Sequence, residues 1–114
     1  AEAQRDAPGL AAALHHSHVR YLSHGASLDD PCSNPICLED ATGLPPTFVL
    51  NCEVDPLRDD SFAWQHKLEA AGVPVQLTTI PGMAHATQSF TLAFPQAKEA
   101  EDNMIAWLRD LISC

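Results

Sequence analysis

The chain has 114 residues, which is enough for one domain and too few for two. Asp and Glu number 15 against 6 Lys and Arg, which gives a formal net charge of −9. Binding to phosphates or anionic lipids requires clustered basic residues, so this balance argues against a nucleic acid or a membrane surface as partner. No stretch approaches the roughly 20 apolar residues of a membrane span. The start of the chain shows no signal-peptide pattern, although it does not begin with Met, and a cytoplasmic setting is expected.

The four cysteines are Cys32, Cys37, Cys52 and Cys114. Cys52 lies in an apolar run and is expected to be a buried small hydrophobe. Cys32 and Cys37 flank a loop of Pro, Ser and Asn without C-x-x-C spacing, so reduced thiols are favoured over a disulfide or a metal site. The sequence predicts no cofactor.

Residues 1–43 are predicted to be a loop-rich segment with one weak helix. Between residues 9 and 22, Leu10, Leu14, Val19 and Leu22 give a short apolar stripe, and Gly25 ends it. Residues 23–46 are rich in Ser, Asp, Pro and Gly, which is typical of a long loop.

Residues 44–114 are predicted to form a strand, a helix, a second strand and a last helix. Residues 47–54 are a mostly apolar run, typical of a strand that is buried on both faces. Asp59 and Asp60 offer N-caps for the helix that follows, and Gly72 and Pro74 end it. The second strand covers residues 75–80 and is closed by Pro81 and Gly82.

Both predicted helices have an apolar face. In the first helix this face consists of Trp64, Leu68 and Ala71, with Trp64 as a core anchor. The last helix runs from about residue 95 to residue 112, and its face consists of Ala97, Ala100, Met104, Trp107, Leu108 and Leu111.

About twenty residues separate the two strands, which suits a crossover through a helix and makes the strands parallel. The fold class is therefore α/β. Parallel strands end at the same edge of a sheet, so Asp55, after the first strand, and His85, after the second, are expected to meet there. Two strands cannot cover a buried-type sheet, so we expect several further strands on the N-terminal side.

A carboxylate beside an imidazole supplies two members of a nucleophilic triad, with Asp55 as the orienting acid and His85 as the base. Taken singly, each residue has an ordinary structural interpretation. An Asp-Pro pair is a common turn, and a single histidine in a Pro-Gly loop is more often non-catalytic. No serine lies in the G-x-S-x-G elbow that would carry the nucleophile; the serines are Ser17, Ser23, Ser27, Ser33, Ser61, Ser89 and Ser113.

Four segments in order resemble the C-terminal part of the hormone-sensitive-lipase-like family of α/β-hydrolases. These segments are Leu44-Pro45-Pro46-Thr47, Asp55-Pro56-Leu57-Arg58-Asp59-Asp60, Ala70-Ala71-Gly72-Val73-Pro74-Val75 and Pro81-Gly82-Met83-Ala84-His85. The resemblance implies a serine carboxylesterase that takes a small ester, with Asp55 and His85 as its catalytic acid and base. It departs at Ala86 and Thr87, where the family commonly has Gly-Phe, and a reshaped acyl pocket is expected there.

Two other functions stay open. The chain can be an inactive, truncated hydrolase that acts by association, with the missing N-terminal part or a second copy covering the open sheet edge. It can also be a metal-binding module built on His15, His16, His18 and His24, although a solvated helix face is the favoured interpretation of these residues.

Overall fold

The computed structural model describes residues 8–113, so Cys114 and the first seven residues lie outside the described part. In chain order the elements are α2 (Pro8–Leu22), the short 3-10 helix η1 (Pro35–Cys37), β1 (Thr47–Val54), α3 (Arg58–Ala70), β2 (Val75–Ala84), the 3-10 helix η2 (Thr87–Ser89) and α4 (Pro95–Ile112). The predicted α/β class and the order strand, helix, strand, helix are confirmed.

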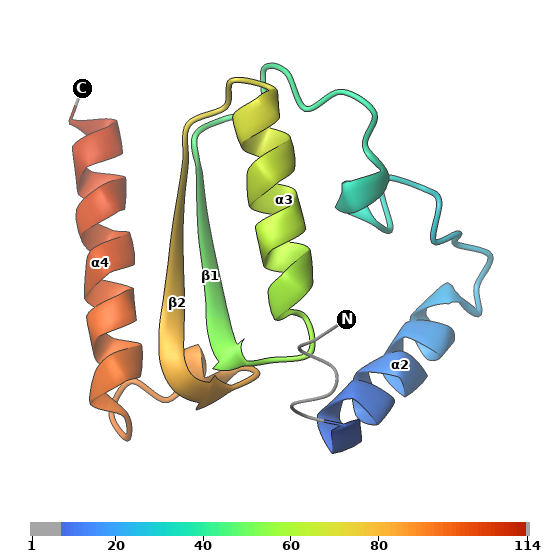
Figure 1. Ribbon diagram of the computed structural model, residues 1–114, viewed down its shortest axis with the longest axis horizontal. Helices are drawn as coiled ribbons and strands as arrows, with labels where there is room; N and C mark the ends of the chain where they lie inside the picture. The colour runs from blue at the N-terminus through green and yellow to red at the C-terminus, as the bar shows by residue number, and fades with distance from the viewer. Residues whose placement is uncertain (1–7, 114) are drawn as a thin grey trace.

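The two strands form a parallel sheet in which Thr47 lies opposite Val75 and Cys52 lies opposite Ile80. Figure 1 shows α3 along one face of this sheet and α4 along the other, so the chain forms three layers. Both strands end at the same edge, and the turn into α3 and the loop toward α4 leave from that edge. This arrangement brings the residues after β1 and β2 together.

Each face of the sheet has its own small core. Toward α3, the buried residues are Ala41, Leu68 and Val73, with the predicted anchor Trp64 packed against them. Toward α4, the buried residues are Cys52, Ile80 and Ala100. Alternation along a strand explains the division, since neighbouring residues of β1 point to opposite faces.

Gly72 ends α3 as the sequence predicts. Its φ of +73° is left-handed, a conformation that favours glycine. The Gly72 N–H donates to the Glu69 carbonyl at 3.0 Å, and the Val73 N–H donates to the Leu68 carbonyl at 3.0 Å. This is the Schellman pattern, and its apolar contact joins Val73 to Leu68 in the core. The cap sets the direction in which the chain enters β2.

The expectation that β1 is buried on both faces is wrong for this chain. Only Asn51 and Cys52 of its eight residues are buried, and most of the others are half-buried. The apolar side chains are present, but one helix per face and one neighbouring strand cover only part of their surface. The radius of gyration is 15.4 Å, against about 13 Å for a compact domain of this length.

Two predicted element ends are also wrong. Asp59 and Asp60 do not cap α3, because the N-cap position falls on Leu57, and both carboxylates lie in the first turn of the helix. There they still face the positive end of the helix dipole. The second strand does not close at Pro81 and Gly82 but continues to Ala84 through an irregular register.

The predicted apolar faces are covered only in part. Ala97 and Ala100 of α4 are buried, whereas Leu108 and Leu111 are 43 % and 40 % exposed. No residue of α2 is buried, so its apolar stripe has no core to face. Within residues 8–113, none of the helices combines the length and the apolar character that crossing a membrane requires.

Candidate active site

Asp55 and His85 meet at the edge where both strands end. The Nδ1 atom of His85 lies 2.9 Å from Oδ2 of Asp55, a hydrogen-bond distance. Asp55 follows β1 directly and His85 follows β2 directly. The parallel topology therefore brings together two residues that are thirty positions apart in the sequence, as predicted.

The Asp55 side chain is buried and held in place. Only 9 % of it is exposed, and its Oδ1 atom accepts a hydrogen bond from the Leu57 N–H at 2.9 Å. The Asp55 carbonyl accepts a second bond from the Arg58 N–H at 3.0 Å. One carboxylate oxygen thus starts the turn into α3, and the other faces the imidazole. This Asx-type turn explains why α3 begins without an Asp59 or Asp60 cap.

The imidazole of His85 is oriented by its contact with the Asp55 carboxylate. Because its Nδ1 faces the carboxylate, a neutral ring carries its proton on Nδ1 and leaves Nε2 as an acceptor. The side chain is 36 % exposed, so the ring is open to a reacting partner. Within residues 8–113, no serine hydroxyl or cysteine thiol is hydrogen-bonded to this ring. The described residues therefore place an imidazole against a buried carboxylate, with no hydroxyl or thiol hydrogen-bonded to the ring.

Arg58 makes two contacts near the start of α3. Its guanidinium lies 3.4 Å from Oδ1 of Asp59. It also donates from Nη1 to the Glu53 carbonyl at 2.9 Å. Arg58 thus links the end of β1 to the start of α3 across the residue that carries the acid. The residue spacing alone gives no signal for this second bond.

The residue after His85 adopts a strained backbone conformation. Ala86 has φ +65° and ψ 9°, in the left-handed region. Thr87 follows it, and its hydroxyl donates to the Ala84 carbonyl at 2.7 Å. The departure from Gly-Phe therefore acts first on the backbone, since an alanine holds a conformation that suits glycine.

We expect Ala86→Gly to stabilise the chain by about 0.5–1 kcal/mol. The left-handed conformation costs alanine about 1–2 kcal/mol, and glycine's greater freedom in the unfolded state offsets part of this gain. Urea unfolding followed by circular dichroism would show a higher midpoint with an unchanged slope. A lower midpoint would mean that the Ala86 methyl group contributes more by packing than it costs in strain.

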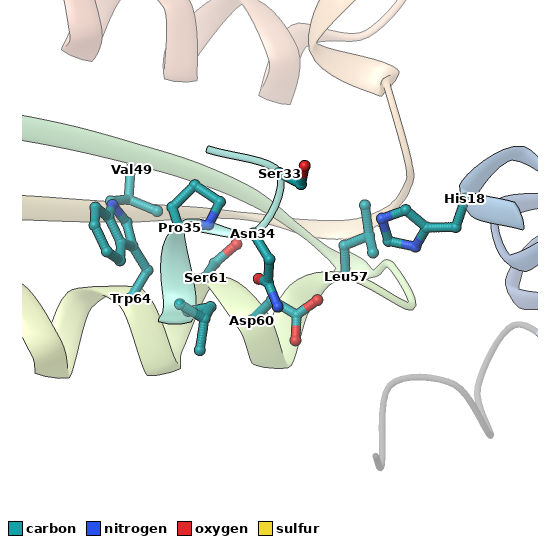
Figure 2. Close-up of a pocket in the computed structure, with 10 residues that line it drawn as sticks. His18, Ser33, Asn34, Pro35, Val49, Leu57, Asp60, Ser61 and Trp64 are labelled. Atoms are coloured by element: carbon teal, nitrogen blue, oxygen red, sulfur yellow. The ribbon is translucent and has the colours of Figure 1, made fainter. Parts of the chain in front are cut away.

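A pocket of about 430 Å³ lies against the α3 face of the sheet, beside the acid-bearing turn. Figure 2 shows Trp64 and Val49 at one end and His18 at the other, with Leu57 between. Its lining includes neither Asp55 nor His85. The hydrogen-bonded pair therefore lies outside this pocket.

The histidine-rich helix does not assemble a metal site in the described part of the chain, where no group of three or more His, Cys, Asp or Glu side chains could hold an ion. His18 instead lies near Asp60, and both line the pocket beside Leu57. Burial raises the pKa of the Asp60 carboxyl, and repulsion from Asp59 acts in the same direction, while His18 opposes them.

Cys52 is the buried thiol that the sequence predicts. It is 2 % exposed and packs in the core toward α4. Burial raises its pKa above the usual range for a thiol, and the nearby Asp55 carboxylate adds to this effect. Cys32 and Cys37 are free thiols, as expected, and Cys32 is exposed.

The two environments predict a large difference in thiol reactivity. At neutral pH we expect Cys32 to react with a disulfide reagent at least about 100-fold faster than Cys52, because the thiolate is the reacting species and Cys52 is both buried and protonated. Mass spectrometry of partly labelled Cys114→Ser protein would assign the sites. Labelling of Cys52 at the rate of Cys32 in folded protein would contradict the burial described.

The comparisons with known proteins agree with this fold. The profile of a family described as having the alpha/beta hydrolase fold matches residues 1–89. The carboxylesterase NlhH of Mycobacterium tuberculosis is 36 % identical over 108 residues, which cover 91 % of this chain and 34 % of that protein. The ethyl acetate hydrolase of Pseudomonas putida is 38 % identical over 68 residues, covering 60 % of this chain and 21 % of that protein.

Solved structures resemble the same part of the fold. A crystal structure of EstE5 soaked with p-nitrophenyl butyrate gives a TM-score of 0.77 at 28 % identity, covering 84 % of this chain and 32 % of that one. An ester hydrolase from the Lake Arreo metagenome, complexed with a bipyridine phosphonate derivative, gives 0.73 at 34 % identity, covering 78 % of this chain and 28 % of that one. The chain therefore belongs to the hormone-sensitive-lipase-like family of α/β-hydrolases, and it spans about a third of the length of the carboxylesterase NlhH that it matches.

Proposed function

We propose that Asp55 and His85 are the acid and base of a serine-type carboxylic ester hydrolase. His85 takes the proton of the nucleophile through Nε2 and returns it to the leaving alcohol. Asp55 holds the ring in the required tautomer and stabilises the imidazolium that forms. The observation that carries the proposal is the 2.9 Å contact between His85 Nδ1 and the buried Asp55 carboxylate.

The electrostatics of the pair support this division of roles. The Asp55 carboxylate is buried and accepts a main-chain hydrogen bond, so its position is fixed before any substrate is present. His85 is more exposed and keeps Nε2 available. A fixed acid behind an accessible base is the arrangement that nucleophilic acyl transfer requires.

The nucleophile is proposed to come from a part of the hydrolase outside these 114 residues. None of the seven serines stands in a G-x-S-x-G elbow. We therefore propose that the chain by itself does not hydrolyse esters through a serine. Purified chain and a His85→Ala variant are expected to be equally silent with p-nitrophenyl butyrate.

A chimera tests the proposal. The 114-residue chain replaces the region that it matches in the M. tuberculosis carboxylesterase, which supplies the remaining two thirds of the fold. If Asp55 and His85 can act as acid and base, the chimera hydrolyses p-nitrophenyl butyrate. A chimera that is folded by circular dichroism and cooperative unfolding, yet gives no turnover, would contradict the proposal.

A second candidate is an inactive chain that acts by association, and two features of the sheet favour it. The side-chain amide of Asn51 is buried, and neither its nitrogen nor its oxygen has a hydrogen-bond partner among the described residues. Among residues 8–113, each strand also has only one neighbouring strand. Sedimentation analysis separates the candidates: a stable dimer combined with an inactive chimera would favour association, and a monomer would argue against self-pairing.

A further inference from the structure

We propose that Glu53 is a positioning residue for the His85–Asp55 pair. Its carboxylate holds an irregular turn of β2 that sets the imidazole over the acid. The inference rests on the proposed function, because it concerns the geometry of the same pair. Glu53 belongs to none of the four segments that carry the family resemblance, and its place in the apolar run of residues 47–54 predicts no role for it.

The register between the strands breaks immediately before the site. Cys52 lies opposite Ile80, but Val54 lies opposite Ala84. One residue of β1, Glu53, therefore faces three residues of β2, from Pro81 to Met83. Gly82, in the middle of this insertion, has a left-handed φ of +66°. The extra residues turn the end of β2, and the chain reaches His85 three residues after Gly82.

Glu53 fixes this insertion by a direct hydrogen bond. The Gly82 N–H donates to Oε2 of Glu53 at 2.6 Å, and Gly82 has no partner in the strand register. A main-chain donor to a carboxylate is a charge-assisted bond, short and stronger than one between neutral groups. The carboxylate of β1 thus takes the place of the missing ladder partner.

The same residue is tied to the acid side of the site. The Glu53 carbonyl accepts the bond from Arg58 Nη1, at 2.9 Å. Glu53 stands two residues before Asp55, and Gly82 stands three residues before His85. Loss of the Glu53 carboxylate would leave the insertion of residues 81–83 without its hydrogen bond and let the His85 imidazole move. Asp55 would stay anchored by the Leu57 N–H. The expected defect is therefore in the geometry of the pair.

Reach and charge can be separated with three substitutions at position 53 in the full chain. Glu53→Gln keeps an oxygen acceptor at the same reach. Glu53→Asp keeps the charge but is one methylene too short. Glu53→Ala removes both, and Glu99→Ala, an exposed glutamate on α4, is the matched control. The readout is the Nδ1 proton of His85 in nitrogen-15-labelled protein, whose exchange with water reports the bond to Asp55.

We expect Glu53→Ala and Glu53→Asp to raise the exchange rate of this proton by about tenfold, the factor that corresponds to losing one hydrogen bond. Glu53→Gln and Glu99→Ala should stay near the wild-type rate. Wild-type exchange in folded Glu53→Ala, or in Glu53→Asp should the alanine variant fail to fold, would overturn the inference. A wild-type protein without a protected Nδ1 proton on His85 would contradict the proposed His85–Asp55 pair itself. That outcome is distinct from wild-type exchange in the Glu53 variants, which contradicts the role of Glu53.

Discussion

His85→Ala in the chimera with the carboxylesterase is expected to lower kcat for p-nitrophenyl butyrate by about 10⁶-fold. Loss of the base in a triad removes almost all nucleophilic catalysis, and what survives comes from substrate binding and electrostatic stabilisation of the oxyanion. KM should change by less than about tenfold, since the imidazole acts in the transition state more than in the binding of substrate.

A second histidine of the same chain supplies the control. His66 lies on α3, and its side chain is 78 % exposed. His66→Ala should leave kcat within about twofold of the unsubstituted chimera, as is usual for a surface substitution. A His85→Ala chimera that retains more than about one hundredth of the activity would show that another group acts as the base.

Asp55→Ala is expected to destabilise the isolated chain by about 2 kcal/mol. The substitution leaves the Leu57 N–H without its acceptor at a partly buried position and removes the partner of His85. An unsatisfied buried donor costs about 1–3 kcal/mol, and relief from burying the carboxylate offsets part of the total. Urea unfolding at neutral pH measures the difference.

Asp55→Asn separates structure from chemistry at the same position. Its side-chain oxygen can still accept from the Leu57 N–H, so it should cost less stability than Asp55→Ala. It cannot hold the imidazole in the same tautomer, and kcat of the chimera should fall by about 10⁴-fold. Equal stability losses for the two variants would show that the Leu57 bond does not support the fold.

Much of the fold follows from local features of the sequence. The strand of residues 47–54 and the helix of residues 95–112 have the predicted bounds, because a mostly apolar run and a proline at the helix start define them. Gly72 ends α3 because the left-handed position after a helix favours glycine. These signals depend on neighbours in the sequence.

Of the features that the sequence did not predict, the extension of β2 depends on residues far apart and the start of α3 depends on a local side-chain contact. The strand β2 continues past Pro81 because the carboxylate of Glu53, 29 positions earlier, accepts the Gly82 N–H. The start of α3 follows from the Asp55 side chain, which accepts a hydrogen bond from the Leu57 N–H in the turn before the helix. Neither contact leaves a periodic pattern, and the Glu53 contact becomes visible only when the two strands are aligned.

Burial was the least predictable property. The apolar pattern of β1 is that of a fully covered strand, yet its residues are mostly half-buried in this chain. An apolar pattern shows that a strand is stable when both its faces are covered. The described helices and the neighbouring strand cover only part of the apolar surface of β1. The site was more accessible to prediction, because parallel topology alone places Asp55 and His85 at one edge.

The pair itself is tested most directly by nuclear magnetic resonance of the chain as it stands, with nitrogen-15-labelled histidine. We expect one imidazole whose proton resides on Nδ1 and is protected from exchange with water. In Asp55→Asn protein that ring should lose this protection and adopt the other tautomer. A His85 ring protonated on Nε2 in wild-type protein, or one whose state is the same in Asp55→Asn protein, would contradict the assignment of Asp55 as the acid that orients His85.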